Sequence, residues 1–233
     1  MKPIKKMKAV ITAVRDLTPT AKELTITLPE PFEFVAGSFV NLFVDLDGEK
    51  IRRAYSMTSG DGVTDTFTIS VRHSLAGRLT PRLWQEDFTG KTIEVMGPLG
   101  LNTIDKMKRR KLFLFGFGIG AGVVKSLTEH ALLRPELEEI VIMTGNRSEE
   151  DIVYREYFDS LIGKDTRVTV TYVVSQASST LGKSGYIQDN ITGLSFHDAD
   201  IYICGQTVAC DGLRAAIMAT NPNGHEFFVE DFH

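Results

Sequence analysis

The sequence predicts two domains, an antiparallel β-barrel or sandwich followed by a doubly wound α/β domain. Up to about residue 100, short runs of alternating apolar and polar residues are separated by turn residues, which is typical of antiparallel sheets. The charged segment at 105–111 (DKMKRRK) then breaks this pattern. Beyond it, continuous apolar runs alternate with helical stretches, as in parallel sheets that are covered by helices on both faces. We therefore expect one domain over residues 1–103 and a second over residues 104–233.

The first domain is expected to contain several strands and one short helix. The alternating runs place strands at 9–16, 21–28, 39–44, 51–56, 66–71 and 92–96. Residues 77–86 do not alternate, and Thr80-Pro81 fits the start of a helix there. A side-chain hydroxyl caps free N–H groups at a helix start, and proline suits the first turn.

The second domain is expected to alternate between strands and helices. Apolar runs predict strands at 111–115, 139–144, 167–174, 200–204 and 226–229. Amphipathic stretches predict helices at 122–133, 151–162 and 208–219, a turn region at 182–185 and a short helix at 186–191. This order predicts a doubly wound parallel sheet.

Composition narrows the class of protein. The chain has 233 residues, of which 42% are hydrophobic and 24% are charged, as in ordinary soluble globular proteins. The net charge of -4 argues against a general nucleic-acid binder. The start is too short and interrupted for a signal peptide, and no apolar run approaches the roughly 20 residues of a membrane span. The only cysteines, Cys204 and Cys210, are too few for a four-thiolate iron–sulfur site. We expect a soluble protein of a reducing compartment, the cytoplasm.

The segment 53–57 (RAYSM) is the main candidate for ligand binding in the first domain. It follows a turn at 47–48 and is expected to be the second strand of a hairpin. Alternation places its first, third and fifth residues on one face. Arg53 offers a planar fork for a diphosphate, Tyr55 a flat ring and Ser56 a small hydroxyl. These groups suit a ligand with a charged middle and an aromatic end, but the pattern also fits an ordinary strand with a solvated arginine.

Two glycine-containing segments are candidates for phosphate binding. The segment 77–80 (GRLT) lies where the short helix is expected to open, and a helix start presents free N–H groups and a positive dipole end. The segment 116–122 (GFGIGAG) joins a strand to a helix, and such a turn lets a diphosphate approach the helix. Its spacing differs from the dinucleotide fingerprint Gly-x-Gly-x-x-Gly.

Three motifs of the first domain resemble, in order, the flavin signatures of the ferredoxin–NADP reductase superfamily. They are Arg53-x-Tyr55-Ser56 followed by Ser59, Gly77-x-x-Thr80, and the turn Gly97-Pro98-Leu99-Gly100. The resemblance implies a Greek-key barrel in which Arg53 and Thr80 bind the diphosphate of FAD. It also implies that Tyr55 packs against the flavin or ribityl chain and that Ser56 lies at the flavin N5 edge. The other FAD contacts that it implies are Ala54, Met57, Val71, Arg72, His73, Gly77, Arg78 and Leu79.

The second domain resembles the NAD(P)-binding domain of the same family. Its glycine-rich turn is similar to Gly-Gly-Thr-Gly-Ile-x-Pro, and the segment 202–207 (YICGQT) is similar to the start of Cys-Gly-Pro-x-x-Met. The second similarity implies that Cys204 lies beside the nicotinamide C4 atom. The implied nucleotide contacts are Gly116, Gly118, Ile119, Gly120 and Gly205. The chain departs from the family's usual residues at Phe115, Phe117, Ala121, Gln206 and Ala209.

Two further segments bear on the nucleotide and the flavin. Arg147 and Ser148 would receive the 2′-phosphate of NADPH, whereas the acidic residues 149–151 that follow would bind the ribose hydroxyls of NADH; both nucleotides remain open. At the end of the chain, the resemblance implies that Glu230 hydrogen-bonds near Ser56 and Cys204. It implies that Phe232, or less readily His233, covers the flavin, and a frayed tail is the competing interpretation.

The resemblance implies an oxidoreductase that moves a hydride from NADH or NADPH to N5 of FAD, with Ser56, Cys204 and Glu230 as catalytic residues. Electrons would pass to a separate acceptor, namely a ferredoxin, a flavodoxin, an oxygenase component or a small molecule. The departures at Phe117, Ala121 and Gln206 keep open an FAD-bearing electron-transfer subunit that uses no nicotinamide nucleotide, and also a flavin-binding module without turnover. The five histidines show no metal-binding spacing.

Overall fold

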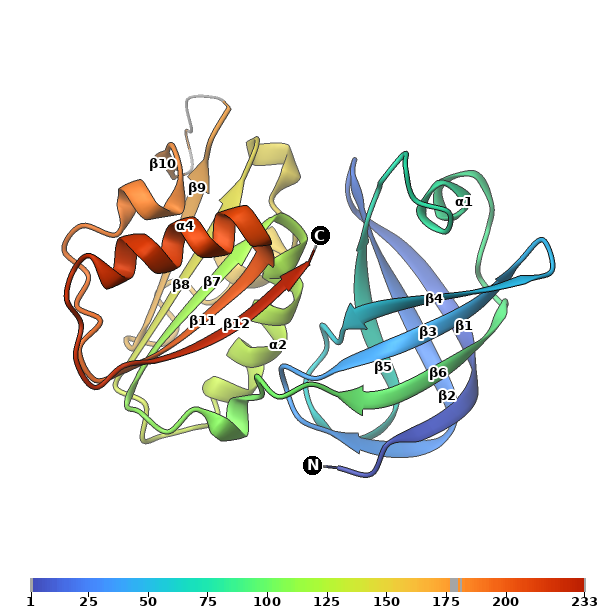
Figure 1. Cartoon of the computed structure of the whole chain (residues 1–233). Coiled ribbons are helices and arrows are strands. Elements are labelled where there is room, and N and C mark those ends of the chain that lie inside the picture. The colour runs from blue at the N-terminus through green and yellow to red at the C-terminus, as the bar shows by residue number, and fades with distance from the viewer. Residues whose placement is uncertain (1, 177–179, 181, 233) are drawn as a thin grey trace.

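The computed structural model describes residues 2–176, 180 and 182–232, and it consists of two domains that lie side by side (Figure 1). The first domain contains β1 to β6 and α1, and the second contains β7 to β12 and α2 to α4. The expectation for His233 lies outside the described residues. Within the described part of the chain, no helix is long and apolar enough to cross a membrane.

Six antiparallel strands form the first sheet, in the order β4-β3-β6-β1-β2-β5. Their bounds are β1 Lys5–Thr18, β2 Ala21–Phe34, β3 Phe39–Leu46, β4 Glu49–Ser56, β5 Gly62–Arg72 and β6 Thr92–Leu99. The two edge strands meet just beyond β4, where Met57 forms an antiparallel bridge with Ile69. This contact closes the sheet, and the predicted antiparallel Greek-key barrel is confirmed.

Strand β2 continues past its predicted end at residue 28. Pro29 and Pro31, which cannot donate ladder hydrogen bonds, follow that position. In the structure, the register between β2 and β5 shifts between Thr27 and Phe32. The prolines therefore lie in an irregularity where the ladder is interrupted, and β2 resumes pairing beyond it.

Helix α1 (Thr80–Gln85) is shorter than predicted and is capped differently. Leu79 occupies the N-cap, without a side-chain cap, and Pro81 lies in the first turn. Thr80 Oγ1 instead donates to the carbonyl of Ser74 at 2.8 Å. The prediction that Thr80 caps this helix is wrong, because its hydroxyl stabilises the preceding loop.

The second sheet has six parallel strands in the order β10-β9-β8-β7-β11-β12. Their bounds are β7 Lys111–Phe117, β8 Glu139–Asn146, β9 Val168–Val174, β10 Lys183–Ser184, β11 Ala199–Gln206 and β12 Glu226–Phe232. The chain moves outward from β7 to β10 and then returns to β11 on the other side of β7. The predicted doubly wound sheet is therefore confirmed.

Alternate residues of β7 pack on opposite faces of this sheet. Leu112 and Leu114 share a buried cluster with residues of α2 (Ala121–Ala131), whereas Phe113 and Phe115 pack with residues of α4 (Thr207–Met218). The cluster on the α2 face also includes Ala21 and Ala36 of the barrel domain. Helix α2 thus lies between the sheet and the barrel (Figure 1).

The predicted helix at 151–162 is wrong. The segment contains the 3-10 turn η3 (Glu149–Asp151) and the five-residue helix α3 (Arg155–Asp159). Tyr154 separates them in the left-handed conformation, with φ 57° and ψ 28°. A tyrosine in this region is uncommon and interrupts a right-handed helix.

Short 3-10 turns complete the second domain and the connector. They are η1 Ile104–Lys106, η2 Gly118–Gly120 and η4 Ile187–Asn190. The predicted division after residue 103 lies between the end of β6 and the start of β7, and the exact boundary stays a prediction.

Candidate active site

A cavity of about 640 Å³ lies between the barrel and the second domain. Many of the predicted site residues line it, although they come from segments far apart in the chain. From the barrel they are Ala54, Tyr55, Ser56, Val71, Arg72, His73 and Thr80. From the second domain they are Ile119, Gly120, Cys204, Glu230 and Phe232.

Three consecutive residues at the end of β4 line this first cavity, namely Ala54, Tyr55 and Ser56. Strict alternation would place them on opposite faces. Because β4 is an edge strand, the free side of its backbone is open to the cavity at this point. Burial raises the pKa of Tyr55 to about 12, against a lowering effect of the nearby Arg53 charge, so this phenol stays protonated at neutral pH.

Five predicted FAD contacts do not line the first cavity, namely Arg53, Met57, Gly77, Arg78 and Leu79. The side chains of Met57 and Leu79 are 0% and 4% exposed and lie in the barrel core, so only their backbone remains for a ligand contact. Arg78 pairs with Glu49 at 2.8 Å on the surface. Arg53 is exposed and donates to the carbonyl of Arg52 at 2.8 Å.

The carboxyl group of Glu230, which lines the first cavity, accepts hydrogen bonds from two side chains. Ser56 Oγ donates to Glu230 Oε1 at 2.9 Å, and Tyr202 Oη donates to Glu230 Oε2. Burial raises the pKa of Glu230 above its ordinary value, while the hydrogen bonds from Tyr202 and Ser56 oppose that rise. The predicted proximity of Glu230 to Ser56 is therefore present in the structure.

Strand register places Cys204 next to Glu230. It is paired with Glu230 across the parallel strands β11 and β12, and it lines the first cavity although it is only 1% exposed. Burial, reinforced by the charge of Glu230, raises the pKa of the thiol well above its usual value. The group is therefore a neutral thiol at neutral pH, unlike the thiolate that a cysteine nucleophile requires.

Tyr202 is a site residue that sequence reasoning did not identify. It is fully buried, and burial raises the pKa of its phenol well above the ordinary value. The available signal was its position two residues before Cys204, since alternate residues of a strand share a face. A tyrosine with no exposed surface generally has a hydrogen-bond partner, and here that partner is Glu230.

The glycine-rich turn approaches Cys204 directly. Strand β7 continues to Phe117, η2 follows, and α2 begins at Ala121. A Cβ atom on Gly120 would lie 2.3 Å from the backbone oxygen of Cys204, so only glycine fits this position. Gly116 is equally constrained, because a Cβ atom there would lie 2.8 Å from the backbone of Ala121.

A second cavity of about 500 Å³ adjoins the first. Its lining includes Phe117, Gly118, Arg147 and Ala209 from the second domain. It also includes Thr18 and Thr20 of the barrel, which the sequence did not indicate. The residues that line both cavities are Arg72, Ile119, Gln206 and Phe232. Gly205 lies behind this cavity, since a Cβ atom there would be 2.6 Å from Phe117 Cβ.

The acidic residues after Arg147 differ in their contacts. Glu149 accepts hydrogen bonds from Thr180, and Asp151 accepts from Ser148 at 2.9 Å and from Thr20 at 3.1 Å. Of the three acidic residues 149–151, only Asp151 lines the second cavity. This cavity therefore contains both a guanidinium and a carboxylate.

The residues of the first cavity fit a flavin nucleotide. Its volume is within the range of roughly 300–1,000 Å³ that is typical of ligand sites. It presents a hydroxyl and a protonated phenol on one side and a carboxyl and a thiol on the other. At one end, the ring of His73 lies 4.6 Å from that of Trp84, which provides an aromatic surface for a base. In the part of the chain that the structure describes, no group of three or more His, Cys, Asp or Glu side chains is placed to hold a metal ion.

Comparison with known proteins agrees with this arrangement. The oxidoreductase FAD-binding domain model matches residues 8–103, and the oxidoreductase NAD-binding domain model matches residues 114–211. The chain is 29% identical over 209 residues to ferredoxin–NADP reductase B of Sorangium cellulosum, a match that covers 85% of each chain. It is 25% identical to the reductase component of phenol 2-monooxygenase from a Pseudomonas species, over 99% of this chain and 67% of that protein.

A solved structure shows the same fold. The ferredoxin NADP+ reductase from Neisseria gonorrhoeae, with bound FAD and NADP, matches with a TM-score of 0.81 at 19% identity, over 96% of this chain and 98% of that chain. The two domain matches, the fold and the two adjoining cavities together identify the class as flavin oxidoreductases with a nicotinamide-nucleotide domain. The two domain matches and the relatives show that the chain belongs to the ferredoxin reductase-like superfamily of FAD- and NAD(P)-dependent oxidoreductases.

Proposed function

We propose that this protein takes a hydride from NADH or NADPH onto FAD in the first cavity and passes the electrons to a separate acceptor. The observation that carries the proposal is the junction of the two cavities. Ile119, Gln206 and Phe232 line both, so a ligand in one cavity meets a ligand in the other there. Bound FAD supplies the conversion of a hydride into single electrons, and the protein supplies the positions of the two ligands.

Each residue at the junction has a role in this proposal. Ser56 and Glu230 form the polar edge of the first cavity, and we assign them to the N5 edge of the flavin. Cys204, as a neutral thiol, shapes the space in which the nicotinamide C4 atom lies. Phe232 covers the junction and moves aside when the nicotinamide ring enters. Arg53 and Thr80 bind the diphosphate of FAD: Thr80 lines the first cavity, and Arg53 is exposed and close enough to Tyr55 in that cavity for its charge to act on the phenol.

The acceptor is proposed from the relatives and from the cysteine content. The two cysteines of this sequence cannot ligate an iron–sulfur cluster of the four-thiolate type, so we propose that the next redox centre lies outside it. The similar Pseudomonas protein is named as the reductase component of an oxygenase. We therefore propose an oxygenase component, a ferredoxin, a flavodoxin or a small molecule as the acceptor. Both cysteines are buried and free, which agrees with a cytoplasmic location.

One anaerobic titration tests this function. The purified protein, loaded with FAD, is mixed with NADH or with NADPH, and the yellow absorbance of the flavin is followed. Bleaching within seconds by either nucleotide supports the proposal, and the faster nucleotide is the preferred one. Because Arg147 and Asp151 both line the second cavity, both nucleotides are compared.

The same titration tests the electron-transfer subunit that uses no nicotinamide. The observation that favours it is that Phe117, Gln206 and Ala209, which replace the usual family residues, all line the second cavity. A flavin that neither nucleotide bleaches, but that a reduced protein partner reduces, would replace our proposal with this alternative. A protein that takes up no FAD would exclude both.

A further inference from the structure

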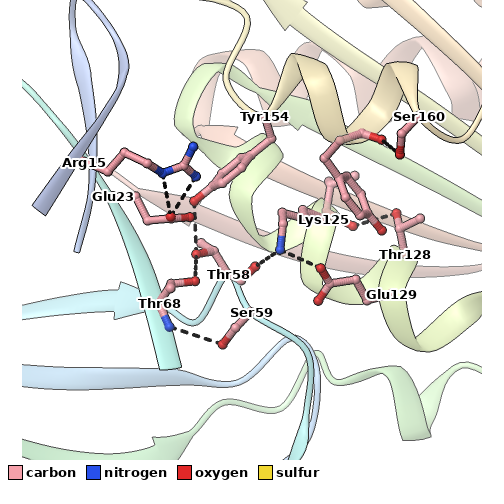
Figure 2. A network of polar contacts seen from close by, with 12 residues as sticks. Arg15, Glu23, Thr58, Ser59, Thr68, Lys125, Thr128, Glu129, Tyr154 and Ser160 are labelled. Carbon is pink, nitrogen blue, oxygen red and sulfur yellow. Dashed lines mark hydrogen bonds and ion pairs between the residues drawn. The ribbon is translucent and has the colours of Figure 1, made fainter. Parts of the chain in front are cut away.

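The contact between the barrel and α2 includes a close-packed polar cluster, which we call the interdomain cluster. It consists of Thr58, Thr68 and Ser70 of the barrel and of Gly122, Lys125 and Tyr154 of the second domain. Figure 2 shows Thr58, Thr68, Lys125 and Tyr154. Tyr154 Oη donates to Thr58 Oγ1 at 3.1 Å, and the hydroxyls of Thr58 and Thr68 lie 2.8 Å apart. Lys125 Nζ donates to the carbonyl of Thr58 at 3.1 Å. Thr58 therefore has two bonds to the opposite domain, one through its side chain and one through its backbone.

Gly122 allows the two domains to approach this closely. A Cβ atom on Gly122 would lie 2.5 Å from Ser70 Oγ and 2.7 Å from Thr58 Cγ2. Thr58 is 1% exposed, and rotation of its side chain would break the hydrogen bonds to Thr68 and Tyr154. Even one additional methyl group at this point would therefore push the domains apart or break the cluster.

Tyr154 has an unfavourable backbone conformation at the same point. Its left-handed φ of 57° is uncommon for a residue with a bulky side chain. The residue is nevertheless 7% exposed, with its ring 3.3 Å from the Cβ position of Gly122 and 5.6 Å from Lys125 Nζ. The backbone turn aims this ring at the barrel, so the interaction with the other domain depends on it.

The cluster lies next to both ligand-binding segments in the chain. Thr58 is two residues after Ser56, and Gly122 is two residues after Gly120. Ser56, Thr58, Ser70 and Gly120 all line the first cavity. A shift between Thr58 and Gly122 must therefore shift the β4 edge against the glycine-rich turn. We propose that the interdomain cluster, through Gly122 and Tyr154, sets the separation of the two ligands and thereby the rate of hydride transfer; this inference rests on the proposed function for its kinetic part.

The test is a comparison of two equivalent substitutions in helices. Gly122→Ala adds a methyl group at the cluster. Gly212→Ala adds the same group in α4, where the nearest heavy atom would be Gln188 Nε2 at 3.8 Å. Alanine is the better helix former at both positions, by up to about 1 kcal/mol in a helix interior, so neither change should destabilise its own helix. Tyr154→Phe, a third variant, removes only the hydroxyl.

Two measurements are made on each variant. Nitroxide labels on Lys8→Cys in the barrel and Met218→Cys in α4 report the distance between the domains; both positions are exposed, and the native cysteines are buried. Flavin reduction at saturating nucleotide reports the transfer rate. A misplacement of about 1 Å lowers such rates by up to about 100-fold. In Gly122→Ala we expect a shifted label distance and flavin reduction that is at least tenfold slower. In Tyr154→Phe we expect a broader distribution of label distances. In Gly212→Ala we expect neither the label distance nor the reduction rate to change.

An unchanged label distance in both Gly122→Ala and Tyr154→Phe overturns the proposal, as does a shifted distance with an unchanged rate in Gly122→Ala. Slower reduction in Gly212→Ala by the same factor also overturns it. If neither nucleotide reduces the flavin of the unmodified protein, the proposed function fails instead. The label distances then decide by themselves whether the cluster holds the domains in place.

Discussion

Replacing Tyr202 by phenylalanine removes one hydroxyl from the core and leaves Glu230 Oε2 without its donor. Tyr202 is 0% exposed and donates to this oxygen. A hydrogen bond to a charged group contributes about 1.5–3 kcal/mol. Because this hydrogen bond opposes the rise that burial causes, its loss should raise the pKa of Glu230 further. The ring is kept, so the packing of the core changes little.

The sign of the pH dependence follows from the direction of the shift. Burial raises the pKa of Glu230 in the folded protein above its unfolded value. The stability from its protonation is therefore full below the unfolded pKa of about 4.3 and is lost as the pH rises through the folded pKa. In Tyr202→Phe the folded pKa is higher still, so more stability is lost over the same rise in pH. We expect a free energy of unfolding close to that of the unmodified protein near pH 4 and about 1.5–3 kcal/mol lower at high pH.

Urea-induced unfolding, followed by circular dichroism at several pH values, measures this difference. Tyr172→Phe is the matched control: Tyr172 Oη donates to Asp159 Oδ1 at 2.8 Å, but the side chain of Asp159 is 43% exposed. Water replaces the lost donor there, so the control should show little dependence on pH. Equal destabilisation by Tyr202→Phe at low and high pH would refute the reasoning, because Glu230 would then not be the group that responds.

Three further predictions concern FAD retention, the rate of flavin reduction and the stability of the fold. Arg53→Ala should weaken FAD retention at least about tenfold with the fold intact, since the proposed charge-assisted contact with the diphosphate would be lost; flavin fluorescence on dilution measures it, and undiminished retention would remove Arg53 from the site. Cys204→Ser should slow flavin reduction more than it weakens nucleotide binding in stopped-flow experiments, whereas Cys210→Ser should not; an equal rate would make Cys204 a packing residue. Arg109→Ala should lower the free energy of unfolding by about 3–5 kcal/mol, because the 0% exposed carboxylate of Asp200 loses its 2.8 Å partner; a loss below about 1 kcal/mol in urea would contradict this.

Most of the fold was predictable from the local periodicity of apolar residues. The strands and the helices α2 and α4 were predictable because one alternating or helical pattern ran through each of them. The helix at 151–162 was not, because its sequence favours a helix while Tyr154 takes a left-handed conformation. That conformation is stabilised by contacts with the barrel, and sequence patterns within the segment carry no information about a partner some 96 residues away.

The site was predictable where a motif and a strand end coincide. Ser56 and Cys204 were identified in this way, and both line the first cavity. The burial of Met57 and Leu79 in the barrel core was not predictable, because a motif gives the order of residues but not the direction in which each side chain points. Thr18 and Thr20 were missed for a related reason. They lie on a barrel turn that meets the second cavity only after the domains have docked.

The carboxyl of Glu230 shows why neither domain contains a complete site. One donor, Ser56, comes from the barrel, and the other, Tyr202, comes from β11 of the second domain. The connector adds a third restraint, because Asn102 Nδ2 donates at 2.7 Å to the carbonyl of Val229, the residue before Glu230. The hydrogen bonds from these two donors lower the pKa of the buried carboxyl, so that pKa shifts when one donor moves. The relative position of the domains therefore affects the electrostatics of the site as well as its geometry, so a change that separates the domains should alter the pH dependence of flavin reduction together with its rate.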